Sequence, residues 1–175
     1  MNTRWFALAV DVRSERSAVD GLHGVVEEVF LPSRIERRAW SDRIKSVEVP
    51  LFPGYCFIRV DLNPTARVAI LKVKHVVDVV GRRAGREGLA PSVPDTEINS
   101  LRLLVAAGRS LDPLAALVAG VPVVVGAGPL RGVRGVVECA VDGQRRLVVN
   151  VALLGRAVRT TLLADDVLEA PRESG

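Results

Sequence analysis

The chain has 175 residues, of which 49% are hydrophobic and 25% are charged, and its formal net charge is +4. This composition excludes an intrinsically disordered chain, and the length allows one domain or two small ones. The basic excess permits a polyanionic partner without requiring one. The chain has no uninterrupted run of eighteen apolar residues and does not open with a secretory leader pattern, so we expect a cytoplasmic protein with no membrane partner.

The first predicted elements in chain order are a strand, a helix and a second strand. Residues 5–12 form a nearly continuous apolar run, which is typical of a central strand covered on both faces. Ser14 is placed to cap a short helix that ends near Leu22, and residues 26–31 predict a strand that Pro32 stops.

A charged arm follows at residues 33–46. Its cations are expected to point into water: Arg34, Arg37, Arg38, Arg43 and Lys45. Trp40 lies in the middle of this arm, where a large apolar ring either folds back on the sheet or contacts another molecule. The usual burial of tryptophan favours folding back.

The densest cluster of aromatic residues surrounds a strand predicted over residues 55–60. The turn residues Pro53 and Gly54 introduce it. Successive side chains of a strand point to opposite faces, so one row is apolar and belongs to the core: Cys56, Ile58 and Val60. The other row carries Tyr55 and Phe57 beside charges. These two rings either cap the core or form a partly open face that meets a partner.

Two further helices complete the first half of the chain. Asn63 is expected to cap a helix whose Val68 and Leu71 face inward, and residues 76–80 predict a strand. A basic loop is expected at residues 82–88. A last helix starts at Pro94 and Asp95, ends at Gly108 and carries three apolar residues at three- and four-residue spacing: Ile98, Leu101 and Val105. The order predicts an α/β sandwich with a mainly antiparallel sheet and flanking helices.

The second half has a different pattern. Asp112-Pro113 and the absence of a strand pattern indicate a linker at residues 109–118. From Val121 on, short apolar runs alternate with glycine turns, and Asp142-Gly143 is a strong hairpin signal. Five short strands in about fifty residues predict a small β-barrel. The fold class is therefore α+β, with domains over residues 1–108 and 119–171.

Groups for catalysis and metal binding are sparse in the sequence. His23 and His75 lie far apart, and neither has a cysteine or second histidine at ligand spacing. Cys56 and Cys139 lie in apolar strand patterns, which favours buried thiols in a reducing compartment. We therefore expect a non-enzymatic protein with no cofactor and no metal.

Several segments together resemble the N-terminal domain of NusG-type transcription elongation factors. In chain order they are Trp-Phe-Ala-Leu at 5–8, Phe-Leu-Pro at 30–32, Pro-Leu-Phe-Pro-Gly-Tyr at 50–55, Val-Gly at 80–81 and Pro-Asp-Thr-Glu-Ile at 94–98. Residues 126–136 resemble a KOW motif, and residues 154–158 resemble the loop and strand that follow it. The resemblance covers residues 4–169. Residues 38–43 and 47–50 are most similar to the specialised UpxY-like paralogues, which act on particular long operons.

The resemblance implies a factor that binds RNA polymerase and raises its processivity. In this family an aromatic depression on the first domain binds the clamp helices of the largest polymerase subunit. The positions that match this site are Trp5, Phe52, Pro53, Gly54, Tyr55 and Phe57, with Phe52 expected at the rim. Ala9 stands where some specialised relatives carry another aromatic residue, which implies a shallower or differently shaped depression.

Two further contacts are implied by the resemblance. Specialised relatives touch the non-template DNA strand, and the candidate residues here are Arg16, His23, Lys72 and Lys74. A solvated basic face is the favoured alternative, because Asp11 stands where a basic residue would help DNA binding. The KOW barrel of relatives docks on ribosomal protein S10 or on Rho. Leu154 and Arg156 match that docking loop, and a buried Leu154 in a tight corner is the alternative.

The leading hypothesis is a monomeric antitermination factor that acts by binding. The alternative is a ribosomal-type KOW protein that binds RNA through its barrel. Low aromatic content in the barrel disfavours base stacking there. Some specialised relatives refold the KOW domain into a helical hairpin, but the β-branched runs at 121–125 and 147–151 predict a barrel.

Overall fold

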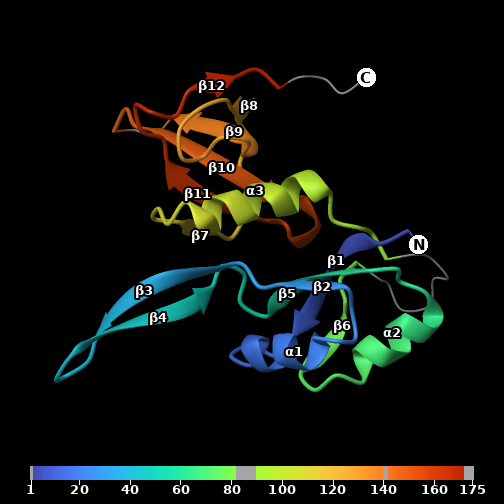
Figure 1. The fold of residues 1–175 in the computed structure, drawn as a ribbon. Helices are drawn as coiled ribbons and strands as arrows, with labels where there is room; N and C mark the ends of the chain where they lie inside the picture. Colours follow the sequence, from blue (N-terminus) through green and yellow to red (C-terminus); the bar gives the residue numbers. More distant parts are fainter. Residues whose placement is uncertain (1, 82–89, 140–141, 172–175) are drawn as a thin grey trace. The chain divides into compact units, whose positions relative to one another are not determined.

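The computed structural model describes residues 2–81, 90–139 and 142–171, and its contacts divide the chain into two compact units, Met1–Asp95 and Thr96–Gly175 (Figure 1). Each unit has a sheet of its own. The predicted basic loop at residues 82–88 lies outside the described residues. In the described ranges, no helix is long and apolar enough to cross a membrane.

The first unit is built on a four-stranded antiparallel sheet in the order β2-β5-β1-β6. Its strands are β1 (Arg4–Val10), β2 (Glu28–Phe30), β5 (Tyr55–Val60) and β6 (Val76–Val79). β1 lies inside the sheet, as its apolar run predicts, and pairs with β5 from Arg4 opposite Val60 to Ala9 opposite Tyr55. This register decides which side chains of the two strands share a face.

Two helices, α1 (Glu15–Leu22) and α2 (Pro64–Leu71), pack against the same face of this sheet (Figure 1). The core beneath them is formed mainly by Phe6, Leu8, Val10, Ala18, Val19, Leu22, Cys56, Ile58, Val60, Ile70 and Val79. The predicted row of Cys56, Ile58 and Val60 is therefore confirmed.

The predicted helix starts are confirmed with corrections in detail. Asn63 caps α2, because its side-chain oxygen accepts a hydrogen bond from the Ala66 N–H at 2.8 Å. Ser14 precedes α1 without a side-chain capping bond. The predicted inward face of α2 is wrong in part: Val68 is 52% exposed, and Ile70 is buried instead.

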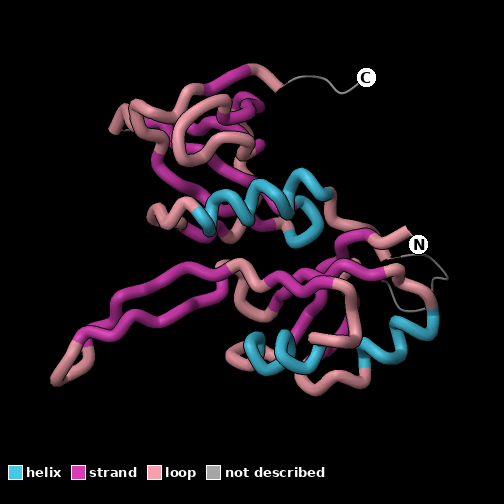
Figure 2. The backbone as a smooth tube through the Cα atoms, in the orientation of Figure 1, coloured by secondary structure: helices cyan, strands magenta, loops and turns pink. Residues whose placement is uncertain are grey.

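The predicted charged arm is a two-stranded hairpin of β3 (Ser33–Ala39) and β4 (Ile44–Pro50), paired from Ser33 opposite Pro50 to Ala39 opposite Ile44. The hairpin extends away from the four-stranded sheet of its own unit (Figure 2). The expectation that Trp40 folds back is wrong, because strand pairing carries it to the far end, where its side chain is 58% exposed.

The second unit contains a six-stranded antiparallel sheet in the order β12-β8-β9-β10-β11-β7, together with α3 (Asp95–Ala106) and the short 3₁₀ helix η1 (Ala152–Leu154). Its strands are β7 (Asp112–Leu114), β8 (Val121–Val125), β9 (Arg134–Cys139), β10 (Arg145–Val151), β11 (Arg156–Thr161) and β12 (Leu168–Glu169). Five of them are the predicted barrel strands.

The sixth strand, β7, lies within the predicted linker. Pro113 pairs with Val158 of β11, and β7 stands at the edge of the sheet. Proline lacks an N–H donor and is tolerated on an edge strand, so Asp-Pro does not exclude a strand here. Residues 112–114 are therefore part of the second unit's sheet.

Helix α3 also belongs to the second unit, so the division at Asp95 falls before the boundary predicted at Gly108. The Ser100 hydroxyl accepts a hydrogen bond from the Arg134 N–H at 2.9 Å, and the Glu97 carboxylate accepts one from the Ala152 N–H. Burial is the main influence on Glu97 and raises its pKa. Arg134 starts β9 and Ala152 follows β10, so in this antiparallel pair both contacts tie the same end of the two strands to the helix.

A buried ion pair between Arg109 and Asp166 joins two segments of the second unit that are distant in the sequence. The Asp166 side chain is fully buried; Arg109 Nη1 donates to its Oδ2, Nη2 donates to Oδ1 at 3.1 Å, and the Leu163 N–H donates at 2.8 Å. Burial alone would raise the pKa of this carboxyl, but the hydrogen bonds from Arg109 and Leu163 outweigh it and hold the pKa below its ordinary value.

We predict that Asp166→Asn lowers the free energy of unfolding by about 3 kcal/mol at pH 7, because it leaves the Arg109 charge uncompensated. A lowered pKa means that the ion pair stabilises the fold above the ordinary value of 3.8 and that this contribution is lost as the pH falls through the folded-state value. Thermal melts followed by circular dichroism should show the two proteins converging in acid. The exposed neighbour Asp165 provides the control, Asp165→Asn; equal effects of the two substitutions would contradict the prediction.

Candidate functional site

A tight turn leads into β5 and fixes where its rings lie. The Tyr55 N–H donates to the Phe52 carbonyl at 3.0 Å across Pro53 and Gly54, and Gly54 has a φ of +82°. Proline at the second position and a residue with positive φ at the third define a type II turn. Glycine is required because a side chain there would also approach Val12.

A buried carboxylate holds this turn against α1. Glu15 is buried in the first turn of the helix, and its Oε1 accepts a hydrogen bond from the Gly54 N–H at 2.9 Å. On the other side of the same glycine, the Val10 N–H donates to the Gly54 carbonyl at 2.9 Å. Gly54 thus joins the start of α1, the end of β1 and the entry to β5.

Sequence reasoning missed Glu15 altogether. An acidic residue in the first turn of a helix is common, and nothing local distinguishes a buried one from a solvated one. What distinguishes Glu15 is its hydrogen bond to Gly54, a residue that is distant from it in the sequence.

The face of the sheet opposite the two helices carries a row of rings, which we call the aromatic face. It is formed by Trp5, Ala7 and Ala9 of β1, Phe30 of β2, and Tyr55 and Phe57 of β5, and Phe52 joins it from the turn. Phe57 lies between two other rings, with centroids 6.3 Å from Phe30 and 6.1 Å from Phe52, the latter edge to face. These distances are favourable for aromatic pairs.

The predicted contact residues differ in exposure. Phe57, Phe52 and Trp5 are buried, at 0%, 1% and 3% exposure, Gly54 is buried, Tyr55 is half-buried and Pro53 is exposed. The expected rim position of Phe52 is therefore wrong, because its ring packs against Phe57. Pro53 and Tyr55 are the accessible members of the set.

The two cysteines have opposite environments. Cys56 is buried on the core row, and burial together with the nearby Glu15 charge raises the pKa of its thiol to about 12. Cys139 is exposed at the end of β9, which corrects the expectation that both thiols are buried. Within the part of the chain that the structure describes, no group of three metal-ligating side chains occurs.

The predicted DNA-binding residues fall in two places. His23 follows α1, and Lys72 and Lys74 follow α2; the two segments meet where Gly21 lies against Val73. These three side chains are exposed. Arg16 lies at the start of α1 and forms an ion pair with Glu48 of β4, so it is separate from the other three.

The predicted docking loop of the barrel is ordered by η1. Leu154 ends this helix and is half-buried, and Gly155 follows with a φ of +62°. Arg156 then starts β11 opposite Val151. The intermediate burial of Leu154 leaves both alternatives open.

A helix-backed antiparallel sheet followed by a small β-barrel with a KOW-like turn defines a class, the transcription elongation factors with a KOW barrel. Comparison with protein families matches residues 3–102 to the family described as transcription termination factor nusG. The chain is 32% identical over 147 residues to the transcription termination/antitermination proteins NusG of Vibrio parahaemolyticus and Vibrio cholerae, which covers 81% of this chain and 78% of theirs.

The fold agrees with a solved structure of Thermotoga maritima NusG, described for its domain interaction, at a TM-score of 0.56 and 20% identity, over 98% of this chain and 99% of that one. The chain belongs to the NusG family of transcription termination/antitermination factors. The family match lies outside the KOW-like segment, which disfavours the alternative of a ribosomal-type KOW protein.

We predict that Glu15→Ala lowers the free energy of unfolding of the first unit by about 1–3 kcal/mol, because the buried Gly54 N–H loses its acceptor. Glu15→Gln keeps an acceptor oxygen and should lose less. Urea unfolding followed by tryptophan fluorescence measures this, since both tryptophans, Trp5 and Trp40, lie in the first unit. A loss no larger than that of Asp20→Ala, an exposed acid on the same helix, would contradict the role of Glu15.

Proposed function

We propose that this NusG-family factor binds the clamp helices of the largest RNA polymerase subunit through its aromatic face and suppresses pausing or termination. The observation that carries the proposal is a row of rings on the sheet face opposite α1 and α2. Aromatic residues are enriched at protein interfaces and dominate their energetics. The family membership supports the same activity.

Within this proposal the residues have different roles. Tyr55 and Pro53 make the contact, because they are the accessible members of the set. Phe52 and Phe57 pack edge to face as buried rings of the same face, and Gly54 sets the turn that leads into Tyr55. Ala9 is half-buried opposite Tyr55, and its small side chain leaves room there for a partner's side chain.

Two further contacts complete the proposal. The exposed cluster of His23, Lys72 and Lys74 contacts the non-template DNA strand through its phosphates. The loop at Leu154 and Arg156 recruits a second protein, S10 or Rho, to the barrel. Both contacts are of binding type and need no catalytic group.

We predict that Tyr55→Ala weakens binding to a purified clamp-helix fragment by about 2 kcal/mol, or about thirtyfold in Kd, because it removes the accessible ring of the interface. Titration calorimetry with the full chain measures the change. Phe52 and Phe57 are unsuitable for this test, since truncating a buried ring also destabilises the fold.

Trp40→Ala provides the matched control, because it removes an exposed ring from the hairpin of the same unit. It should leave the Kd for the clamp-helix fragment unchanged. Wild-type affinity in Tyr55→Ala would overturn the proposed binding face.

A further inference from the structure

The tip of the β3–β4 hairpin carries a tryptophan that the proposed function does not use. Trp40 remains 58% exposed although its ring already has a cation, Lys45 Nζ, 5.3 Å from its centroid. Exposed tryptophan is uncommon, because the ring gains more from burial than any other side chain. A ring held in the open beside cations is suited to stacking on a flat ligand.

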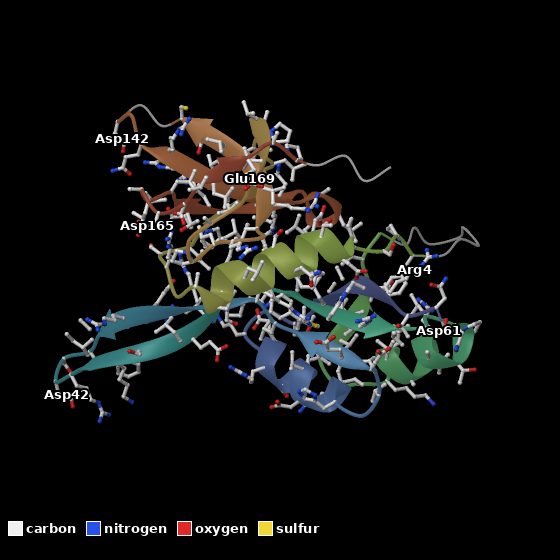
Figure 3. The ribbon with its side chains drawn as sticks, turned by 45° about the horizontal axis from the view of Figure 1, so that its top comes forward. Arg4, Asp42, Asp61, Asp142, Asp165 and Glu169 are labelled. Carbon is white, nitrogen blue, oxygen red and sulfur yellow. The ribbon has the colours of Figure 1, made fainter. Side chains whose placement is uncertain are left out.

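Hydrogen bonds at the tip decide which side chains accompany Trp40. The Trp40 N–H donates to the Arg43 carbonyl at 2.8 Å and the Arg43 N–H donates back at 3.4 Å, so Ser41 and Asp42 form a two-residue turn. Asp42 marks this end of the hairpin in Figure 3. Residues directly opposite each other share a face.

The register therefore sorts the hairpin into two faces. The Trp40 face carries Arg34, Glu36, Arg38 and Trp40 from β3 and its turn, and Arg43, Lys45, Val47 and Val49 from β4. The opposite face carries Ile35, Arg37, Ala39, Ile44, Ser46 and Glu48. The cations are thus concentrated on the side of the ring.

The single acid of the Trp40 face is already engaged. Glu36 accepts hydrogen bonds from Arg34 at 2.6 Å and from Arg38 at 3.2 Å, and these bonds lower the pKa of its carboxyl. Glu36 therefore stays ionised and paired near neutral pH. Asp42 of the turn lies 3.9 Å from Arg43, so four cations against these two acids still leave this surface with a net positive charge.

The positive surface continues to the base of the hairpin. A groove of about 340 Å³ lies between α1 and the hairpin, and Arg13, Arg16 and Arg38 line it. Its two acids have partners: Glu15 accepts from Gly54, and Glu48 pairs with Arg16. Arg38 belongs to both surfaces and connects them.

We propose that the Trp40 face binds single-stranded nucleic acid, with phosphates on the cations of the hairpin and groove and one base stacked on the Trp40 ring. A cationic track with an aromatic platform is the combination that binds unpaired strands without sequence preference. Phosphates and the flat faces of bases are common to DNA and RNA, so a surface that contacts these groups takes both kinds of strand.

The ring favours an unpaired strand over a duplex. In a duplex the faces of the bases are covered by their neighbours, so Trp40 would have no partner and only the phosphate contacts would remain. This site is separate from the aromatic face, so its test does not depend on polymerase binding.

The experiment uses the full chain and 12-nucleotide fluorescein-labelled oligo(dT), oligo(U) and a duplex of equal length, followed by fluorescence anisotropy. Unlabelled oligonucleotides are then used for tryptophan emission. Trp5 is buried, so quenching reports on Trp40. We expect similar affinities for the two single strands, quenching by both, and no quenching by the duplex.

The variants give the proposal its sharpest test. Trp40→Ala should weaken single-strand binding about tenfold, and Trp40→Phe should recover most of it. Arg38→Ala should weaken binding about threefold and reduce the salt dependence by about one phosphate contact. Arg37→Ala removes the same charge from the opposite face of the same strand and should leave the Kd within about twofold of wild type.

Four results would overturn the proposal: no binding of either single strand, wild-type affinity in Trp40→Ala, equal losses in Arg37→Ala and Arg38→Ala, or tryptophan quenching by the duplex. Quenching by anionic phospholipid vesicles with no oligonucleotide binding would likewise assign the ring to a membrane surface. Clamp-helix binding by Trp40→Ala serves as the control for folding.

Discussion

The hydrogen bond between the Glu15 carboxylate and the Gly54 N–H is the constraint on which the first unit depends. It is made in a buried setting, where a donor without an acceptor is costly. Through one glycine it joins the first helix to the end of β1 and the entry to β5. The position of Tyr55, and with it the accessible part of the aromatic face, follows from a contact on the opposite side of the sheet.

The two faces of the sheet in the first unit differ in what they carry. Both helices pack on the face that carries Cys56, Ile58 and Val60, which forms the core of this unit. The opposite face holds rings and small residues in the register that β1 and β5 impose. A substitution among the accessible rings therefore changes binding with less effect on folding than one in the core row.

Period-two alternation was enough to predict the core row of β5, and turn chemistry predicted the helix starts and most of the barrel. The failures have a common cause in contacts between segments distant in sequence. Phe52 was expected at a rim, but it packs on Phe57. Trp40 was expected to fold back, but hairpin pairing carries it away from the sheet. Pro113 led to the prediction of a linker where the structure has the edge strand β7, since a local pattern cannot show which strands lie at an edge.

The two-residue turn at Ser41 and Asp42 limits how the hairpin can change in length. Inserting one residue between Ala39 and Trp40 and one between Arg43 and Ile44 would move Trp40 to the side of Ile35 and Ile44, because side chains alternate. Inserting two residues at each point would keep the ring with its cations and extend the reach by about 7 Å. Homologues with hairpins of other lengths should therefore differ by pairs of residues in each strand wherever the ring and the basic side chains stay together.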